Sequence, residues 1–152
     1  MSSKKKVLLV VPPFFRLVES QNRRVSPALH YLAQVLHERG HDARLFNADH
    51  DTEDECYGDW KSILQNHWAI DYRVEHGHKS FDEVAAYAKE FDPDYVVIMA
   101  GDILIPTTDF GSVKCAFKML DVIEKAVPNA HTVAYGHQFI WADTYDLNRF
   151  SA

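Results

Sequence analysis

The sequence is short of the residues that build several common classes of site. Its two cysteines, Cys56 and Cys115, define neither a disulfide framework nor a zinc site. Its six glycines form neither Gly-x-Gly-x-x-Gly nor a P-loop, which disfavours an ordinary dinucleotide or nucleoside triphosphate site. No nucleophile-elbow motif is present, so a nucleophile, a base and an acid cannot be assigned. We therefore predict no catalytic residue and no metal ligand in this chain.

Long apolar runs and an overall basic charge are also missing. No run reaches membrane-spanning length, and the run after residues 1–6 is too short and too proline-bounded for a signal peptide. The formal net charge of -6 argues against nucleic acid as a partner. We expect a cytoplasmic protein with reduced cysteines that binds neither membrane nor nucleic acid. The charge is uneven, because residues 1–47 hold eight Lys and Arg against three Asp and Glu.

What the sequence does contain is an alternation of apolar strands and amphipathic helices. With 152 residues and 47% apolar content it can bury one core, so a single domain over residues 1–152 is predicted. Strands are predicted near residues 6–11, 43–46, 95–100 and 132–135, with helices between them. This order predicts an α/β fold, with a doubly wound, mainly parallel, Rossmann-like or flavodoxin-like sheet of four to five strands.

Local signals predict where the helices begin and end. Ser26 supplies an N-cap oxygen and Pro27 suits the first helical position, while Gly40 permits a left-handed cap at the other end. Ser80-x-x-Glu83 is a capping box that predicts the start of a second helix. These helices should return the chain to the amino end of the sheet.

Two segments break the strand and helix rhythm. Residues 48–78 are predicted to be an insertion with one helix, packed by Trp60 and Trp68. Residues 140–152 are a tail that either adds a poor fifth strand or links to a further domain. His76-x-His78 and Asp49-His50-Asp51 resemble loose metal clusters, but no zinc pattern supports them.

Three loops should meet at the carboxyl edge of the sheet, where open α/β sheets bind ligands. They span residues 12–26, 101–111 and 136–139. Prolines stiffen the first loop, its phenylalanines offer flat apolar surface, and its arginines can pair with phosphate or carboxylate. Its candidate ligand-binding residues are Pro12, Pro13, Phe14, Phe15, Arg16, Arg23, Arg24 and Ser26.

The other two loops add a glycine and polar groups each. A glycine lets a ligand approach the backbone, and hydroxyl groups supply hydrogen bonds. The candidates are Gly101, Asp102, Thr107, Thr108, Gly136, His137 and Gln138. His137 is compatible with a metal ligand, a base or a polar surface group. Asp102 alone suggests the phosphoacceptor of a response-regulator receiver, but acidic residues after the first strand and a late lysine are absent.

Several of these segments together carry a family resemblance. Val7-Leu8-Leu9-Val10-Val11-Pro12-Pro13, Pro27-Ala28-Leu29-His30-Tyr31-Leu32-Ala33, Leu36, Gly40-His41, Pro93-Asp94-Tyr95-Val96-Val97-Ile98 and Tyr135-Gly136-x-Gln138 supply its pattern. The chain resembles the amino-terminal cobalamin-binding domains of cobalamin-dependent radical S-adenosylmethionine enzymes. The resemblance covers most of the chain outside residues 48–78.

The resemblance implies a Rossmann-like domain that holds cobalamin (vitamin B12) at the carboxyl edge, with the nucleotide tail beside the sheet. The implied partners are a corrinoid and a radical S-adenosylmethionine catalytic domain or protein, with a homodimer as a further option. Four departures from the family pattern stand out. Val11 replaces an asparagine, Ala28 a glycine and Tyr135 the first glycine of a Gly-Gly pair, where its ring could crowd the tail. The Asp-x-His-x-x-Gly motif of many other corrinoid proteins is absent, as it generally is in this family. The fourth departure is the missing Cys-x3-Cys-x2-Cys motif, so no iron–sulfur cluster is expected here.

Two other functions stay open. One is the amino-terminal half of a two-Rossmann-domain glycosyltransferase, whose second nucleotide-sugar domain this chain has no room for. The other is a degenerate Rossmann-like interaction domain without a small ligand, for which exposed Trp60 and Trp68 would mark a partner surface.

Overall fold

The computed structural model describes residues 3–19, 26–50, 68–101, 109–141 and 147–150. Along the chain the elements alternate between strands and helices, as predicted. They are β1 (Lys6–Val11), η1 (Arg16–Val18), α1 (Pro27–Glu38), β2 (Asp42–Asn47), α3 (Trp68–His76), α4 (Lys79–Phe91), β3 (Tyr95–Met99), α5 (Asp109–Ala126), β4 (His131–Tyr135) and η2 (His137–Trp141).

The four strands form one parallel sheet in the order β2-β1-β3-β4. This confirms the α/β, doubly wound prediction, including the expected pairing of the first strand with the third. Val7 lies opposite Tyr95 in that central pair, and Val97 lies opposite Val133 in the next. The described residues contain no fifth strand. From β1 the chain continues to β2 on one side of the sheet, and from β3 it continues to β4 on the other side. The topological switch point of the sheet therefore lies between β1 and β3.

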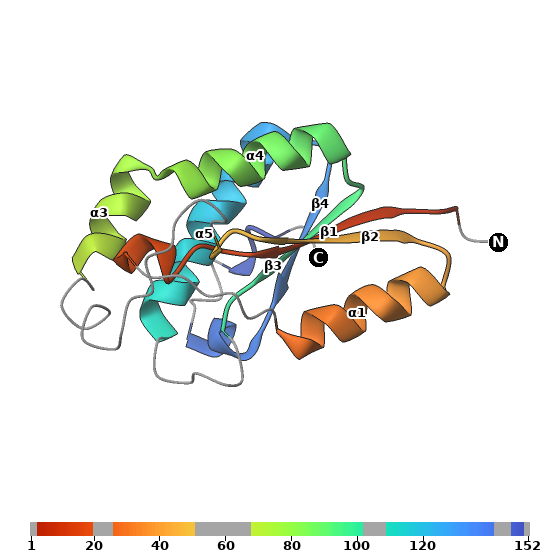
Figure 1. Ribbon diagram of the computed structural model, residues 1–152, viewed down its shortest axis with the longest axis horizontal. Helices are drawn as coiled ribbons and strands as arrows, with labels where there is room; N and C mark the ends of the chain where they lie inside the picture. Colours follow the sequence, from red (N-terminus) through yellow and green to blue (C-terminus); the bar gives the residue numbers. More distant parts are fainter. Residues whose placement is uncertain (1–2, 20–25, 51–67, 102–108, 142–146, 151–152) are drawn as a thin grey trace.

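Helices cover the two faces of the sheet unequally (Figure 1). Successive residues of a strand point to opposite faces, so Leu8 and Val10 belong to one apolar cluster and Leu9 and Val11 to another. The first cluster is closed by α3, α4 and α5. The second lies under α1, with Leu29 at its centre. Only α1, among the described helices, packs on this second face.

The helix ends agree with the sequence in part. Ser26 is the N-cap residue of α1, Pro27 follows it, and Gly40 has a φ of 85°, all as predicted. The hydroxyl of Ser26, however, makes no capping hydrogen bond. The predicted capping box at Ser80 is wrong. His78 is the N-cap of α4, and its Nδ1 accepts a hydrogen bond from the Ser80 backbone N–H (3.3 Å).

Phe150, at the carboxyl end of the described residues, and Phe14, in the loop after β1, both pack into the first apolar cluster. Phe150 is buried against Phe117 of α5 and Phe139 of η2, with ring centroids 5.9 and 5.5 Å apart. Phe14, predicted to offer surface to a ligand, is buried in the same cluster. Within the predicted insertion at residues 48–78 the structure describes α3, whose first residue Trp68 is exposed and does not pack the insertion as predicted. Residues 51–67, which include Trp60, lie outside the described part. No described helix is both long and apolar enough to span a bilayer.

Candidate functional site

The loops after β3 and β4 meet at the carboxyl edge, as their predicted positions require. Gly101 has a φ of 89°, and a Cβ there would lie 2.5 Å from Cγ of the fully buried Gln138. Gly136 has a φ of 124°, and a Cβ there would lie 2.1 Å from the backbone oxygen of Ala100. Both positions therefore require glycine because of close packing within the protein. His137 lies between Gly136 and Gln138 in the chain and is exposed.

The loop after β1 is held from inside the protein. The Arg16 side chain is only 5% exposed, and its Nη1 donates to the Ala48 carbonyl (3.0 Å). Nη1 and Nη2 also donate to the two carboxylate oxygens of Glu83 on α4, at 2.7 and 3.1 Å. This two-point ion pair fixes both partners in direction as well as distance. Arg16 was expected to bind an anionic ligand, but here it ties the loop to α4.

Asp49 completes this attachment from the end of β2. Its Oδ1 accepts the backbone N–H of Arg16 (3.0 Å) at the first turn of η1. Asp49 is 2% exposed, and burial raises the pKa of its carboxyl from 3.8 to about 7, against backbone hydrogen bonds from Arg16, Phe15 and Phe14. We call Arg16, Asp49 and Glu83 the loop clamp.

Arg73 of α3 holds the other end of η1. Its Nη1 donates to the Leu17 carbonyl (2.7 Å), and its Nη2 donates to the Glu19 carboxylate (2.8 Å). Glu19 has a φ of 59°, so the chain turns out of η1 in a left-handed conformation. Residues 16–19 of this loop are thus held by contacts to α3, α4 and the end of β2, in addition to the prolines that precede them.

The remaining predicted residues divide into two groups. The first group is buried or partly buried: Pro12, Pro13 and Ser26 are buried, and Phe15 is partly buried. These side chains shape the loop and offer little surface to a ligand. The second group lies outside the described residues and consists of Arg23, Arg24, Asp102, Thr107 and Thr108.

Sequence reasoning missed a groove on the α1 face of the sheet. Its volume is about 510 Å³, and it lies between α1 and strands β3 and β4. Valines form its floor, leucines of α1 form one wall, and tyrosines and basic residues stand at its ends. The lining residues are Lys5, Val7, Leu32, Leu36, His41, Tyr95, Val97, Val133 and Tyr135.

The groove exists because α1 is narrower than the apolar sheet beneath it. Parallel strands are normally covered on both faces. Here Leu29 is fully buried, but Leu32 and Leu36 of the same helix face are only partly buried. The signal was in the sequence, since β4 carries Val133 and Tyr135 on this face and only one predicted helix was available to cover it.

The two histidines of His76-x-His78 bond to neighbouring protein groups, and the other cluster, Asp49-His50-Asp51, extends at Asp51 beyond the described residues. His76 Nδ1 donates to the Tyr72 carbonyl (2.9 Å) and its ring stacks on that of Tyr72. His78 bonds the Ser80 hydroxyl (2.7 Å), and burial, followed by the charges of Arg16 and Arg73, lowers its pKa. Among the described residues, no three His, Cys, Asp or Glu side chains are grouped to hold a metal ion.

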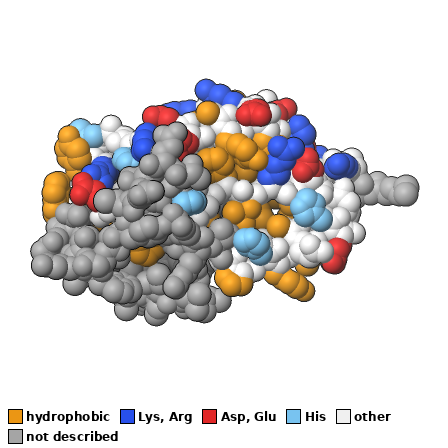
Figure 2. Space-filling model, viewed as in Figure 1, with side chains coloured by type: hydrophobic (Ala, Val, Ile, Leu, Met, Phe, Trp, Pro, Cys, Tyr) orange, Lys and Arg blue, Asp and Glu red, His pale blue; other side chains and the backbone are white. Residues whose placement is uncertain are grey.

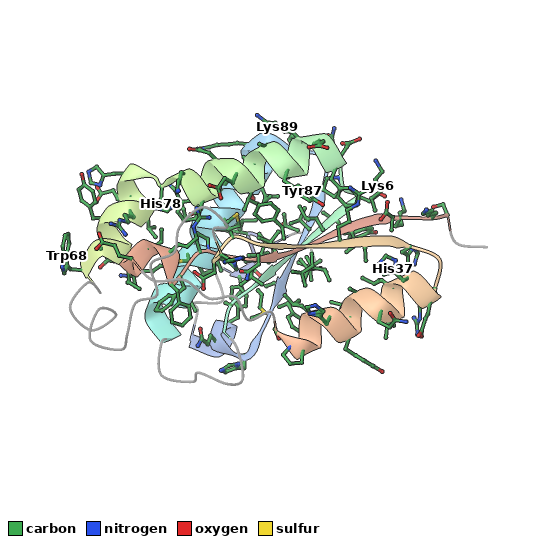
Figure 3. All side chains as sticks on the ribbon, viewed as in Figure 1. Lys6, His37, Trp68, His78, Tyr87 and Lys89 are labelled. Carbon is green, nitrogen blue, oxygen red and sulfur yellow. The ribbon has the colours of Figure 1, made fainter. Side chains whose placement is uncertain are left out.

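The described surface exposes three large aromatic side chains, Tyr31, Trp68 and Tyr72. Trp68 begins α3 and is 68% exposed, and it points away from the body of the protein (Figure 3). On the face shown in Figure 2, Lys and Arg side chains are interspersed with Asp and Glu over α4. Trp60, the other tryptophan predicted for a partner surface, lies outside the described residues.

Comparison with known proteins gave no relatives: no family model, no curated protein and no solved structure matches this chain.

Proposed function

We propose that this chain is a cobalamin-binding domain that serves a radical S-adenosylmethionine catalytic domain or partner protein. The observation that carries the proposal is the groove, an apolar space of about 510 Å³ along the sheet between α1 and strands β3 and β4. A cobalamin carries an extended nucleotide tail that ends in a flat aromatic base, and a groove of this shape suits such a group. One end of the groove, at Tyr135, lies at the carboxyl edge of the parallel sheet, the edge where α/β proteins commonly bind ligands.

The residues present fit the tail rather than the whole cofactor. Small-molecule pockets measure roughly 300–1,000 Å³, so the groove has room for a base and its sugar. Val7, Val97 and Val133 give the apolar floor that an aromatic ring needs. The corrin ring would then lie outside, over the carboxyl edge, with Tyr135 at the place where the tail enters.

The chain's own residues would bind and orient the cofactor. Gly136 and Gly101 let the loops after β4 and β3 pack closely together at this edge, and the exposed His137 offers a polar group there. The loop clamp holds the start of η1 in one place, so ordering that part of the loop would cost little conformational entropy on binding. When bound, cobalamin supplies alkyl-transfer chemistry at its cobalt. The sequence has no Cys-x3-Cys-x2-Cys motif, so radical chemistry falls to the partner.

Corrinoid retention tests the proposal. The purified protein is mixed with hydroxocobalamin or methylcobalamin and desalted, and the corrinoid absorbance of the protein fraction is measured. We expect retention near one corrinoid per chain. No retention of either form would overturn the cofactor assignment and leave the fold unaffected.

A matched pair of variants on α1 tests whether the nucleotide tail of the cofactor binds in the groove. Leu32 lines the groove, so Leu32→Trp fills part of it and should abolish retention. Tyr31 is the preceding residue and is 73% exposed, so Tyr31→Trp places a tryptophan on the outside and should retain corrinoid as the wild type does. Circular dichroism checks that both variants fold. Full retention by Leu32→Trp would show that the tail lies elsewhere.

A further inference from the structure

The two ends of the groove differ in chemistry. Tyr135 is the last residue of β4 and lies opposite Met99, beside the carboxyl edge. Lys5, His41 and Tyr95 lie at the amino ends of β1, β2 and β3, at the other end of the groove. A ligand that enters past Tyr135 therefore meets an apolar floor first and basic side chains last.

His41 presents a hydrogen-bond donor at that inner end. Its Nδ1 accepts the backbone N–H of Lys5 (3.2 Å), so in the neutral ring the proton resides on Nε2. The described residues provide no hydrogen-bond partner for Nε2. Lys5 also lines the groove, and its Nζ pairs with the Asp94 carboxylate (3.2 Å), a pair that is more than a third exposed on both sides. The inner end thus offers donors to whatever reaches it.

The depth of the groove matches a ribosyl base. Tyr95 and Met99 are four residues apart on β3, and Met99 is level with Tyr135. At about 3.3 Å per residue, the groove extends about 13 Å along the strands. The base is the terminal group of a cobamide tail, so its outer edge would reach His41 and Lys5.

We infer that the groove selects cobamides whose lower base has a hydrogen-bond acceptor on its outer edge, with purine-type bases favoured over 5,6-dimethylbenzimidazole. This inference rests on the proposed function. An adenine ring presents nitrogen acceptors toward His41 Nε2–H, whereas the dimethyl edge of the benzimidazole leaves that donor buried without an acceptor. Leaving a donor unpaired on binding costs more than a lost contact, because its water is removed and not replaced.

Dissociation constants for three corrinoids test the inference. Adeninylcobamide should bind about tenfold more tightly than the dimethylbenzimidazole form, the gain of about one hydrogen bond. Cobinamide, which has no nucleotide, should bind more weakly than both. The free bases, adenine and 5,6-dimethylbenzimidazole, are titrated in parallel, with NMR shifts of the Val7, Val97 and Val133 methyl groups as the readout.

Variants of His41 separate recognition from folding. His41→Leu removes the donor and should abolish the preference for the purine form. His41→Asn keeps an acceptor for the Lys5 N–H and an amide donor, so it should restore part of the preference. The control is His37→Leu on α1 (Figure 3), which does not line the groove and should leave the preference unchanged.

Each outcome decides one of the two claims. Equal affinity for the two cobamides, or a preference that survives His41→Leu, overturns the inference while corrinoid binding stands. Loss of binding for every corrinoid overturns the proposed function. In that case the free-base titration still decides whether the groove distinguishes the two ring edges, and equal shifts would overturn the inference as well.

Discussion

The backbone oxygen of Ala100 occupies the space into which a side chain at Gly136 would extend, 2.1 Å from the position of its Cβ. The φ of 124° at Gly136 adds backbone strain for any other residue. Gly136→Ala should therefore lower the free energy of unfolding by about 3 kcal/mol, measured by urea denaturation.

Gly40 provides the matched control for that substitution. Its φ is 85°, but a Cβ there would meet nothing within 4 Å. Gly40→Ala should cost only about 1 kcal/mol, from the left-handed conformation alone. Equal losses in the two variants would show that the contact with Ala100 relaxes without cost.

The loop clamp should respond to removal of its exposed partner. Glu83→Ala leaves the Arg16 guanidinium, which is 5% exposed, without its ion pair. Breaking a buried pair costs about 3–5 kcal/mol, and the partial exposure of Glu83 reduces this to about 2 kcal/mol. Asp71→Ala, which breaks the exposed pair with Lys114, should cost less than about 0.5 kcal/mol in the same assay.

Asp49 should give the protein a stability that falls as the pH rises. Its folded pKa of about 7 is above the unfolded value of 3.8, so the native state holds the extra proton between these values. The free energy of unfolding should decrease by a few kcal/mol, about 4 at most, from pH 4 to pH 7. Asp49→Asn removes the titration and should flatten this part of the profile. An unchanged slope in the variant would assign the effect to other groups.

Phe150 should anchor residues 147–150 to the core. Its ring is buried among Phe117 and Phe139, so Phe150→Ala leaves a cavity and should cost about 3 kcal/mol of unfolding free energy. The exposed Tyr72 on α3 is the comparison, and Tyr72→Ala should cost less than about 1 kcal/mol. A small loss at Phe150 would mean that this segment docks only weakly.

Hydrophobic patterning was enough to predict the sheet. The run from Val7 to Val11 is apolar at every position because both faces of β1 are buried, and Tyr95–Met99 follows the same rule. Parallel order and the central pairing of β1 with β3 then follow from the alternation with helices. Gly101 and Gly136 also lie in the loops after β3 and β4, where the sequence placed them, and both have positive φ.

The partners of polar side chains were not predictable in the same way. Arg16 suggests an anion site when only its neighbours in the sequence are known, but its partner Glu83 is 67 residues away. Glu83 in turn completes a capping-box pattern at Ser80, although its carboxylate is used by Arg16. Asp49 stood in an acidic run, and nothing in that run indicates that it is buried. Such pairings depend on which helix packs over which loop.

The pairing of β1 with β3 also has a consequence for synthesis of the chain. Val7 and Tyr95 are 88 positions apart, yet they lie side by side at the centre of the sheet. A ribosome adding about 5–20 residues per second needs roughly 4–18 s to make that interval. For that time the newly made Val7–Val11 segment has no β3 to pair with, so nascent chains are most prone to aggregate then.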